Sequence, residues 1–179
     1  MPTYVAFLRA INLGPTRTFP KADIVIATEA AGGTDVATHI NTGNVRLTTS
    51  LRSRAKVEAA LEAAYETDRG FAVPTIVLTP AELRQIVADA DDLDADLTGG
   101  GRHYASLLKD PPTASATKAI ESAGGDGARA FVRDRAVHLL IDGDYHSASL
   151  TNAQVEKALG VATNRNLTVI RALVEKWCG

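Results

Sequence analysis

The sequence predicts an α+β fold of two halves, each with an antiparallel β-sheet, and C-terminal helices that pack against the body. Two observations support this prediction. Apolar runs and turn residues in the first half give the order strand, helix, strand, strand, helix, strand, which is the order of the ferredoxin-like α/β plait. A second series of strands and helices follows residue 80. We therefore predict an N-terminal ferredoxin-like half at residues 1–79 and a plait-like C-terminal half at residues 80–179, which carries two terminal helices.

The elements of the first half are separated by start and stop signals. Pro20 lies at the first turn of a helix that Gly32-Gly33 ends. Ser50 or Ser53 caps a second helix. Between these helices, Asn41-Thr42-Gly43-Asn44 interrupts an apolar run with residues that tolerate positive φ, so we expect a tight turn there. The strands are expected at residues 4–8, at residues 36–47 around that turn, and at residues 73–78.

The second half opens with a helix start at Thr79-Pro80-Ala81-Glu82. Five aspartates among residues 89–96 predict a solvated acidic connector, and Gly99-Gly100-Gly101 predicts a hinge. Thr151 begins a capping box, and Thr163 is the expected cap of the last helix. The other elements are expected as strands at residues 104–108, 128–132 and 136–141 and a helix at residues 113–123.

Composition excludes several classes of protein. A formal net charge of −2 predicts no broad attraction to nucleic acid or to anionic membranes. No apolar run is long enough for a transmembrane helix, and the N-terminus lacks the pattern of a signal peptide. The single cysteine, Cys178, excludes an intrachain disulfide, so we expect a cytoplasmic protein. The four histidines have no paired ligand spacing, so we expect no metal and no cofactor.

Three polar clusters interrupt the apolar pattern, at residues 9–14, 41–44 and 163–168. In the third, a helix N-terminus beside Arg165 predicts affinity for an anion. Arginine suits carboxylate and phosphate groups, and asparagine and threonine add directional hydrogen bonds. We therefore predict that the clusters converge on a cleft between the halves and bind a small anionic or nucleotide-like ligand. The predicted ligand-binding residues are Arg9, Asn12, Asn41, Thr42, Gly43, Asn44, Thr163, Arg165 and Asn166.

Two other functions stay open at this point. In an enzyme, the same polar cleft would hold the substrate and His39 would be the candidate acid or base. No nucleophile with an evident base is present, since Cys178 lies beside the C-terminus where chains fray, so the catalytic residues are unknown. An RNA-binding plait is less favoured because the expected strands lack the aromatic and basic pattern of such modules. The sequence does not indicate an oligomeric state.

The chain resembles a bacterial family known only as domain of unknown function 1697. Residues 4–14, Tyr-Val-Ala-Phe-Leu-Arg-Ala-Ile-Asn-Leu-Gly, are similar to the Tyr-Val-Ala-Leu-Leu-Arg-Gly-Ile-Asn-Val-Gly that opens this family. Residues 40–45, Ile-Asn-Thr-Gly-Asn-Val, are similar to its Ile-Gln-Ser-Gly-Asn-Val. Residues 162–169 resemble its Ala-Thr-x-Arg-Asn-Trp-Asn-Thr-Val ending, although Leu167 and Thr168 replace an aromatic residue and an asparagine.

The resemblance implies two ferredoxin-like halves in a soluble bacterial protein with no assigned activity. It covers nearly the whole chain in order. One departure affects the first polar cluster: the glycine that follows the first arginine of the family is Ala10 here, which narrows the backbone conformations open to that loop. The resemblance therefore supports the fold and leaves the function to be derived.

Overall fold

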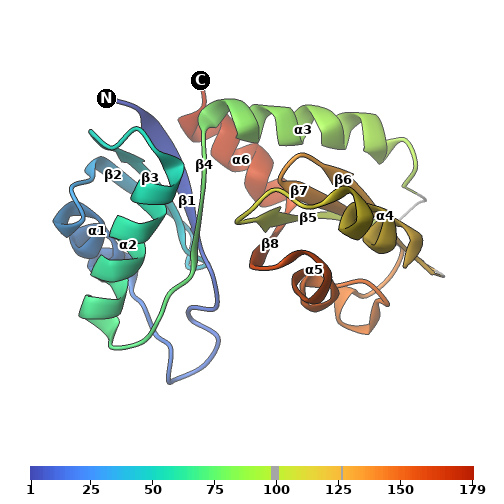
Figure 1. The fold of residues 1–179 in the computed structure, drawn as a ribbon, viewed down its shortest axis with the longest axis horizontal. Coiled ribbons are helices and arrows are strands. Elements are labelled where there is room, and N and C mark those ends of the chain that lie inside the picture. Colours follow the sequence, from blue (N-terminus) through green and yellow to red (C-terminus); the bar gives the residue numbers. More distant parts are fainter. Residues whose placement is uncertain (98–100, 126) are drawn as a thin grey trace. The chain divides into compact units, whose positions relative to one another are not determined.

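The computed structural model describes residues 1–97, 101–125 and 127–179, which form two compact units, Met1–Pro80 and Ala81–Gly179. We call them unit 1 and unit 2, and Figure 1 labels their elements. The α+β fold with two four-stranded antiparallel sheets is confirmed. No helix in the described ranges combines the length and apolar character needed to cross a membrane.

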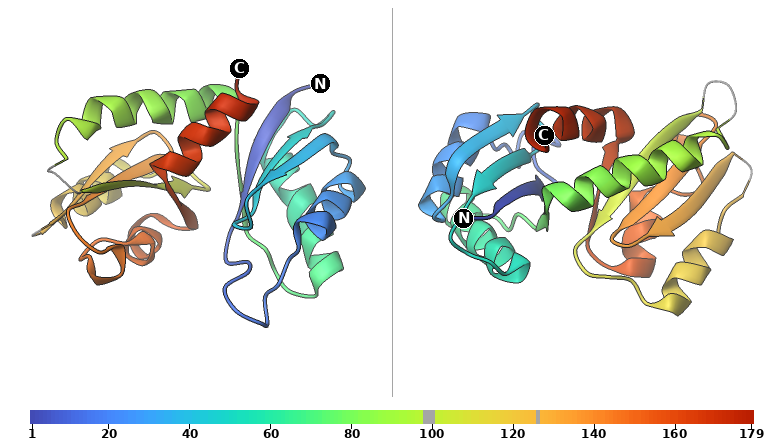
Figure 2. Two further views of the ribbon diagram at one scale, coloured as in Figure 1. Left: turned by 180° about the vertical axis from the view of Figure 1, so that it is seen from behind. Right: turned by 90° about the horizontal axis from the view of Figure 1, so that it is seen from above.

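Unit 1 is a ferredoxin-like plait. Its sheet has the strand order β2-β3-β1-β4, in which every neighbouring pair is antiparallel. Both helices cover one face of this sheet (Figures 1 and 2). The elements are β1 (Thr3–Leu8), α1 (Lys21–Ala30), β2 (Thr34–His39), β3 (Asn44–Thr48), α2 (Arg54–Arg69) and β4 (Thr75–Leu78).

The core of unit 1 follows from alternation along β1. Tyr4, Ala6 and Leu8 point to the helix-covered face, where they join one buried apolar cluster with Leu61 and other residues of the helices. The buried Tyr65 hydroxyl on α2 lies 2.8 Å from the Thr28 hydroxyl on α1. A polar group at this depth is stable because it is hydrogen-bonded. This pair therefore fixes the two helices against each other.

Unit 2 repeats the plait and adds a helix at each end. Its sheet has the order β6-β7-β5-β8, again antiparallel throughout. Helices α4 and α5 cover one face, and α3 and α6 cover the other (Figures 1 and 2). The elements are α3 (Pro80–Asp94), β5 (Arg102–Leu108), α4 (Ala114–Ser122), β6 (Ala128–Arg133), β7 (Ala136–Ile141), a 3-10 turn (Tyr145–Ser147), α5 (Asn152–Leu159), β8 (Ala162–Asn166) and α6 (Leu167–Trp177).

Each unit has an equivalent backbone hydrogen bond at the end of the first strand of its sheet. The Leu8 amide donates to the Gly43 carbonyl at 2.8 Å, and the Leu108 amide donates to the Arg135 carbonyl at 2.8 Å. Each acceptor lies immediately before the third strand of its own sheet. The units therefore use the same supersecondary structure at equivalent positions, and the two donor amides are 100 residues apart in the sequence.

Two sequence-based expectations about unit 2 were wrong. Residues 163–166 do not open the last helix: they form most of strand β8, and α6 begins at Leu167. The acidic run is no connector, because residues 89–94 form the last part of α3. Ile86, Ala90 and Leu93 are buried on one face, and this apolar stripe continues the helix to Asp94. The expected glycine hinge lies partly outside the described residues.

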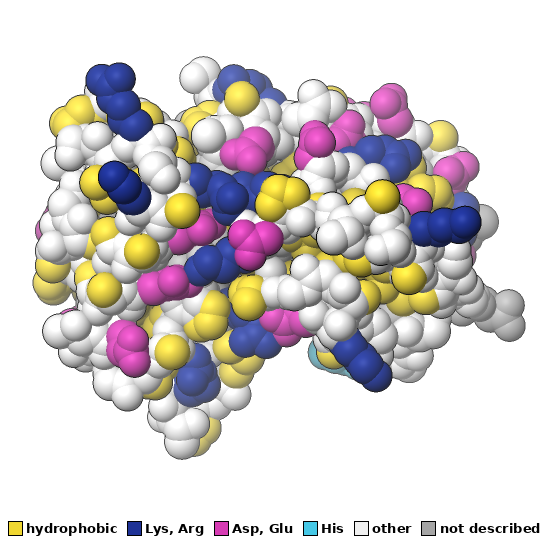
Figure 3. Space-filling view, in the orientation of Figure 1, with side chains coloured by type: hydrophobic (Ala, Val, Ile, Leu, Met, Phe, Trp, Pro, Cys, Tyr) yellow, Lys and Arg dark blue, Asp and Glu magenta, His cyan; other side chains and the backbone are white. Residues whose placement is uncertain are grey.

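The surface carries charges of both signs. Figure 3 shows one face, on which lysine and arginine side chains are interspersed with aspartate and glutamate. This mixture agrees with the net charge of −2. A ligand that is recognised by charge must therefore be held by a local arrangement of side chains.

Candidate functional site

Unit 2 contains a pocket of about 350 Å³ where three elements meet. The end of α3, the start of β5 and the junction between β8 and α6 surround it. Its wall carries charged side chains, a histidine and the first residues of a helix. The lining residues are Asp94, Leu97, Gly101, Arg102, His103, Asn166, Leu167, Thr168 and Arg171.

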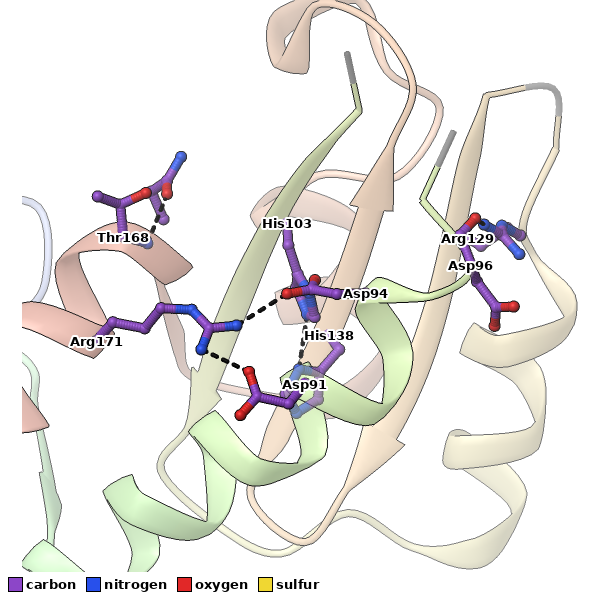
Figure 4. Close-up of polar contacts among 9 residues, drawn as sticks. Asp91, Asp94, Asp96, His103, Arg129, His138, Thr168 and Arg171 are labelled. Carbon is purple, nitrogen blue, oxygen red and sulfur yellow. Dashed lines mark hydrogen bonds and ion pairs between the residues drawn. The ribbon is translucent and has the colours of Figure 1, made fainter. Parts of the chain in front are cut away.

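Arg171 is the most constrained cation of the pocket. Its Nη1 donates to Asp91 Oδ1 at 2.6 Å and its Nη2 donates to Asp94 Oδ2 at 2.8 Å, so one guanidinium group ties α6 to two successive turns of α3 (Figure 4). Arg102 is exposed at the start of β5. The lining therefore holds two guanidinium groups against one carboxylate, that of Asp94.

The N-terminus of α6 adds positive potential to this wall. Asn166 is the cap residue, and its Oδ1 accepts a hydrogen bond from the Thr168 amide at 2.8 Å. The first amides of a helix have no partner within the helix, and the helix dipole places a partial positive charge of about +0.5 there. Both effects act in the same direction as Arg102, because Asn166 and Thr168 line the pocket.

A chain of hydrogen bonds leads from the pocket wall into the core of unit 2. Asp94 Oδ1 lies 2.7 Å from His103 Nδ1, and His103 Nε2 lies 2.8 Å from His138 Nδ1 (Figure 4). His103 is 6% exposed and His138 is completely buried. The two histidines lie on neighbouring strands, on the sheet face that α3 covers. We call Asp94, His103 and His138 the relay.

The relay fixes where the protons lie. The Asp94 carboxylate accepts from Arg171 and from His103, so the proton of a neutral His103 is on Nδ1. His103 Nε2 must then accept from His138 Nδ1, which leaves His138 Nε2 without a proton. Within the described ranges, His138 Nε2 has no hydrogen-bond partner. This assignment follows from the hydrogen-bond network.

Burial keeps both histidines neutral at pH 7. It lowers the pKa of His103 from 6.5, although the hydrogen bond and negative charge of Asp94 oppose this effect. Burial, followed by the proximity of His103, lowers the pKa of His138 to about 4. Perturbed histidines beside a pocket are a known mark of functional sites, and buried structural networks perturb a pKa too. The pocket wall therefore contains one titratable histidine, His103, whose protonation state can change.

The first two predicted clusters meet within unit 1, where their side chains hold loops together. Asn12 Nδ2 donates to the Asn41 carbonyl at 2.8 Å and to the Phe19 carbonyl at 3.1 Å, and its Oδ1 accepts from the Phe19 amide. Asn44 Nδ2 donates to the His39 carbonyl at 2.9 Å and to Thr42 Oγ1 at 3.0 Å. Asn41 and Thr42 are exposed at the tip of the turn.

Left-handed backbone is concentrated in these two loops. Ala10, Asn12 and Ile40 have φ of 57°, 54° and 51°, and Gly43 has φ of 77°. This region is unfavourable for a residue with a Cβ, most of all for a β-branched one such as Ile40. Unit 2 makes the equivalent β6–β7 connection with two residues, Asp134 and Arg135. The plait itself therefore does not require the longer turn of unit 1.

The third predicted cluster is part of strand β8. Thr163 is not a helix cap, because it pairs with Leu107 of β5. Arg165 is buried, and its Nη1 donates to Thr163 Oγ1 at 2.9 Å and to the Asn164 carbonyl at 2.8 Å. Burial lowers the pKa of Arg165 to about 10. Among the predicted ligand-binding residues, Asn166 lines the unit 2 pocket.

The predicted convergence of the clusters on one cleft stays a prediction, because Arg9, Asn12 and residues 41–44 belong to unit 1 and the third cluster belongs to unit 2. The candidate thiol is a poor nucleophile. Cys178 is buried, and burial raises the pKa of its thiol. In the described part of the chain, no group of His, Cys, Asp and Glu is placed to hold a metal ion.

Apart from Asn166, sequence reasoning missed the residues that line the pocket. Two signals were present. His138 lies within one expected strand and His103 immediately before another, and Asp91 and Asp94 are three residues apart, as on one helix face. Neither signal predicts which residues these side chains contact, because the contacting residues are up to 80 positions apart in the sequence, as Asp91 and Arg171 are.

Comparison with known proteins identifies the family. A solved structure described as the conserved bacterial protein SP0830 of Streptococcus pneumoniae matches with a TM-score of 0.73, 16% sequence identity and 98% of each chain covered. At this identity the likeness concerns the fold alone. No curated protein matches the chain. A family model described as "Protein of unknown function (DUF1697)" matches residues 1–138, and the chain therefore belongs to this family.

Proposed function

We propose that the protein binds a small ligand through an oxyanion group, a carboxylate or a phosphate, in the pocket of unit 2. The observation that carries the proposal is the charge of the pocket wall. Arg102, Arg171 and the N-terminus of α6 line it, against the single carboxylate of Asp94. An anion that enters the pocket meets the exposed Arg102 and the positive end of α6, while Arg171 is already paired with Asp91 and Asp94.

The size of the pocket supports a small ligand. A volume of about 350 Å³ lies near the lower end of the range of about 300–1,000 Å³ that ligand sites occupy. Arg171 supports the site by its rigidity, because its two ion pairs hold the guanidinium in one place before any ligand arrives. Such preorganisation lowers the entropic cost of binding.

Binding is better supported than catalysis by the same wall. A general base must present a free nitrogen to its substrate. Both ring nitrogens of His103 are engaged, one by Asp94 and the other by His138. His103 therefore accepts a proton from a substrate only through a rearrangement of these hydrogen bonds. This favours an electrostatic role for His103 over direct proton abstraction.

The proposal keeps the predicted class of ligand and changes most of the predicted residues. Asn166 is common to both sets. Arg165 and Thr163 support the site indirectly. Their mutual hydrogen bond stiffens strand β8, which leads into Asn166 and α6. The unit 1 residues Arg9, Asn12 and 41–44 remain an independent candidate surface.

Titration followed by NMR tests the proposal. Sulfate represents a phosphate group and methanesulfonate a carboxylate, and neither probe titrates near neutral pH. At pH 7.5 and constant ionic strength, at least one probe is expected to shift the backbone amide signal of Thr168 saturably. Arg102→Gln is expected to weaken binding about tenfold or more, since a hydrogen bond to a charged group contributes about 1.5–3 kcal/mol.

Arg52→Gln is the matched control, because Arg52 is an exposed arginine of unit 1. It removes the same charge from the protein as Arg102→Gln and leaves the pocket intact. The proposal fails if neither probe shifts the Thr168 signal, or if both variants weaken binding equally, since the effect would then come from net charge alone.

A further inference from the structure

We infer that an oxyanion bound in this pocket brings one proton with it, which the His103–His138 pair takes up, so that the ligand binds more tightly as the pH falls. The inference rests on the proposed function and adds its regulation. It is carried by the position of the relay, whose first two members, Asp94 and His103, line the pocket while the third lies in the core.

Charges of both signs surround the pair without a ligand. Asp94 favours a charged His103 and Arg171 disfavours it. Asp89 and Asp94 favour a charged His138, whereas Arg133 disfavours it. The charged groups around the pair come from α3, β5, β6 and α6, and they are Asp89, Asp91, Asp94, Arg102, Arg133 and Arg171.

A bound oxyanion changes these surroundings in one direction. It places negative charge beside His103, in the same pocket, and it competes with Asp94 for Arg171. An opposite charge within about 4–6 Å stabilises the protonated form of a histidine. A weaker hold of Arg171 on Asp94 also leaves that carboxylate more available to His103. Both effects favour a protonated His103.

The relay can accept one proton without losing a hydrogen bond. In the neutral chain, His138 Nδ1 donates to His103 Nε2. When His103 is protonated it donates from both nitrogens, to Asp94 and to His138 Nδ1, while the proton of His138 moves to Nε2. The two distances of 2.7 and 2.8 Å serve equally well in either direction.

A second proton does not fit. With both histidines charged, His103 Nε2 and His138 Nδ1 would each carry a hydrogen and face each other at 2.8 Å. That contact would join two like charges in the core, where they are least screened. Uptake is therefore limited to one proton for each bound ligand.

The sign and size of the pH effect follow from linkage. Without ligand, burial holds the pKa of His103 below 6.5, so the pair is neutral at pH 7. A ligand that raises this pKa binds most tightly below the ligand-free pKa, and the gain is lost as the pH rises through the pKa of the bound state. A rise of one pKa unit corresponds to about a tenfold gain in affinity.

The test measures Kd from pH 7.5 to pH 5.5 at constant ionic strength, with whichever of sulfate and methanesulfonate binds more tightly. Both probes keep their charge in this range, so a change in Kd comes from the protein. The Thr168 amide signal reports occupancy, and histidine ring signals report protonation. We expect Kd to fall about tenfold and the pKa of the relay to rise when the probe is bound.

Variants separate the relay from other histidines. His103→Asn is expected to abolish the pH dependence of Kd, whatever its affinity at pH 7.5. His146→Asn removes an exposed histidine of the 3-10 turn and is expected to retain the dependence. If His103→Asn does not fold, the ring titration of the intact protein with and without probe decides the question.

A Kd that is independent of pH in the intact protein would overturn the inference, and so would a pH dependence that survives in His103→Asn. These outcomes differ from a failure of the proposed function. In that case neither probe shifts the Thr168 signal at any pH.

Discussion

Replacement of Gly43 by alanine is expected to destabilise unit 1 for two separate reasons. Gly43 has φ of +77°, where a side chain costs about 1–2 kcal/mol. A Cβ there would also lie 2.7 Å from Leu8 Cβ and 2.9 Å from Ile11 Cδ1. Leu8 is buried in the central strand β1 and cannot move away, so the overlap costs about another 1–3 kcal/mol. The sum is about 2–5 kcal/mol.

Gly70 provides a matched control. Its φ of +74° is nearly the same, but a Cβ there meets nothing within 4 Å. Gly70→Ala therefore carries the backbone cost alone. In urea unfolding followed by circular dichroism, a slope of about 2 kcal/mol/M converts a loss of 3 kcal/mol into a midpoint about 1.5 M lower. We expect Gly43→Ala to lower the midpoint clearly more than Gly70→Ala.

Equal losses of unfolding free energy in the two variants would refute this reasoning, because the close contact between the turn and β1 would then contribute nothing to the cost. A loss near zero in both would also refute the assignment of left-handed strain. The comparison bears on function as well, since the turn at Gly43 presents Asn41 and Thr42, the exposed residues of the predicted unit 1 surface.

Three further predictions concern other groups. Ile40→Asn should stabilise the protein by about 0.5–1 kcal/mol in urea unfolding, because asparagine tolerates φ of +51° better than isoleucine; a loss of stability would contradict this. Burial lowers the pKa of folded His138 from 6.5 to about 4, so the unfolded state binds more protons between these values, and the free energy of unfolding decreases by up to about 3 kcal/mol as the pH falls from 6.5 to 4; His138→Leu should flatten this part of the pH profile, and an unchanged profile would contradict the burial argument. Cys178 should react with iodoacetamide at least about tenfold faster in urea than in the folded protein, and equal rates would mean that the thiol is not buried.

Local sequence signals predicted unit 1 well because each element there has its own start or stop residue. The turn at Asn41–Gly43 and the helix end at Gly70 need positive φ, and glycine occupies both critical positions. The apolar face of α2 and the alternation in β1 place the core on one side of the sheet. In such elements the local preference and the tertiary structure agree.

Strand β8 was missed because tertiary pairing overrides its local pattern. Thr163 and Asn166 are both good cap residues, so a helix start was predicted three residues too early. Asn166 is the real cap. Pairing with β5, from Tyr104 opposite Asn166 to Leu108 opposite Ala162, extends the preceding residues into a strand. No property of this polar segment alone reveals that partner.

The relay was missed for a similar reason. A run of aspartates normally indicates a solvated segment, and the helical stripe of Ala90 and Leu93 is interrupted by acids. Asp94 joins the proposed site through contacts with His103 and Arg171, which lie on other elements. An internal repeat gave a further unused signal, since Tyr104 to Lys109 matches Tyr4 to Arg9 in pattern and marks the equivalent strand.

The most direct test of the account is an amide NMR map of the whole protein during a titration with sulfate and with methanesulfonate at pH 6.5. The account predicts saturable shifts concentrated at residues 101–103 and 166–171, around the pocket wall. Shifts concentrated instead at residues 9–14 and 41–44 would move the site to unit 1. The absence of saturable shifts anywhere would contradict the central claim that unit 2 binds an oxyanion.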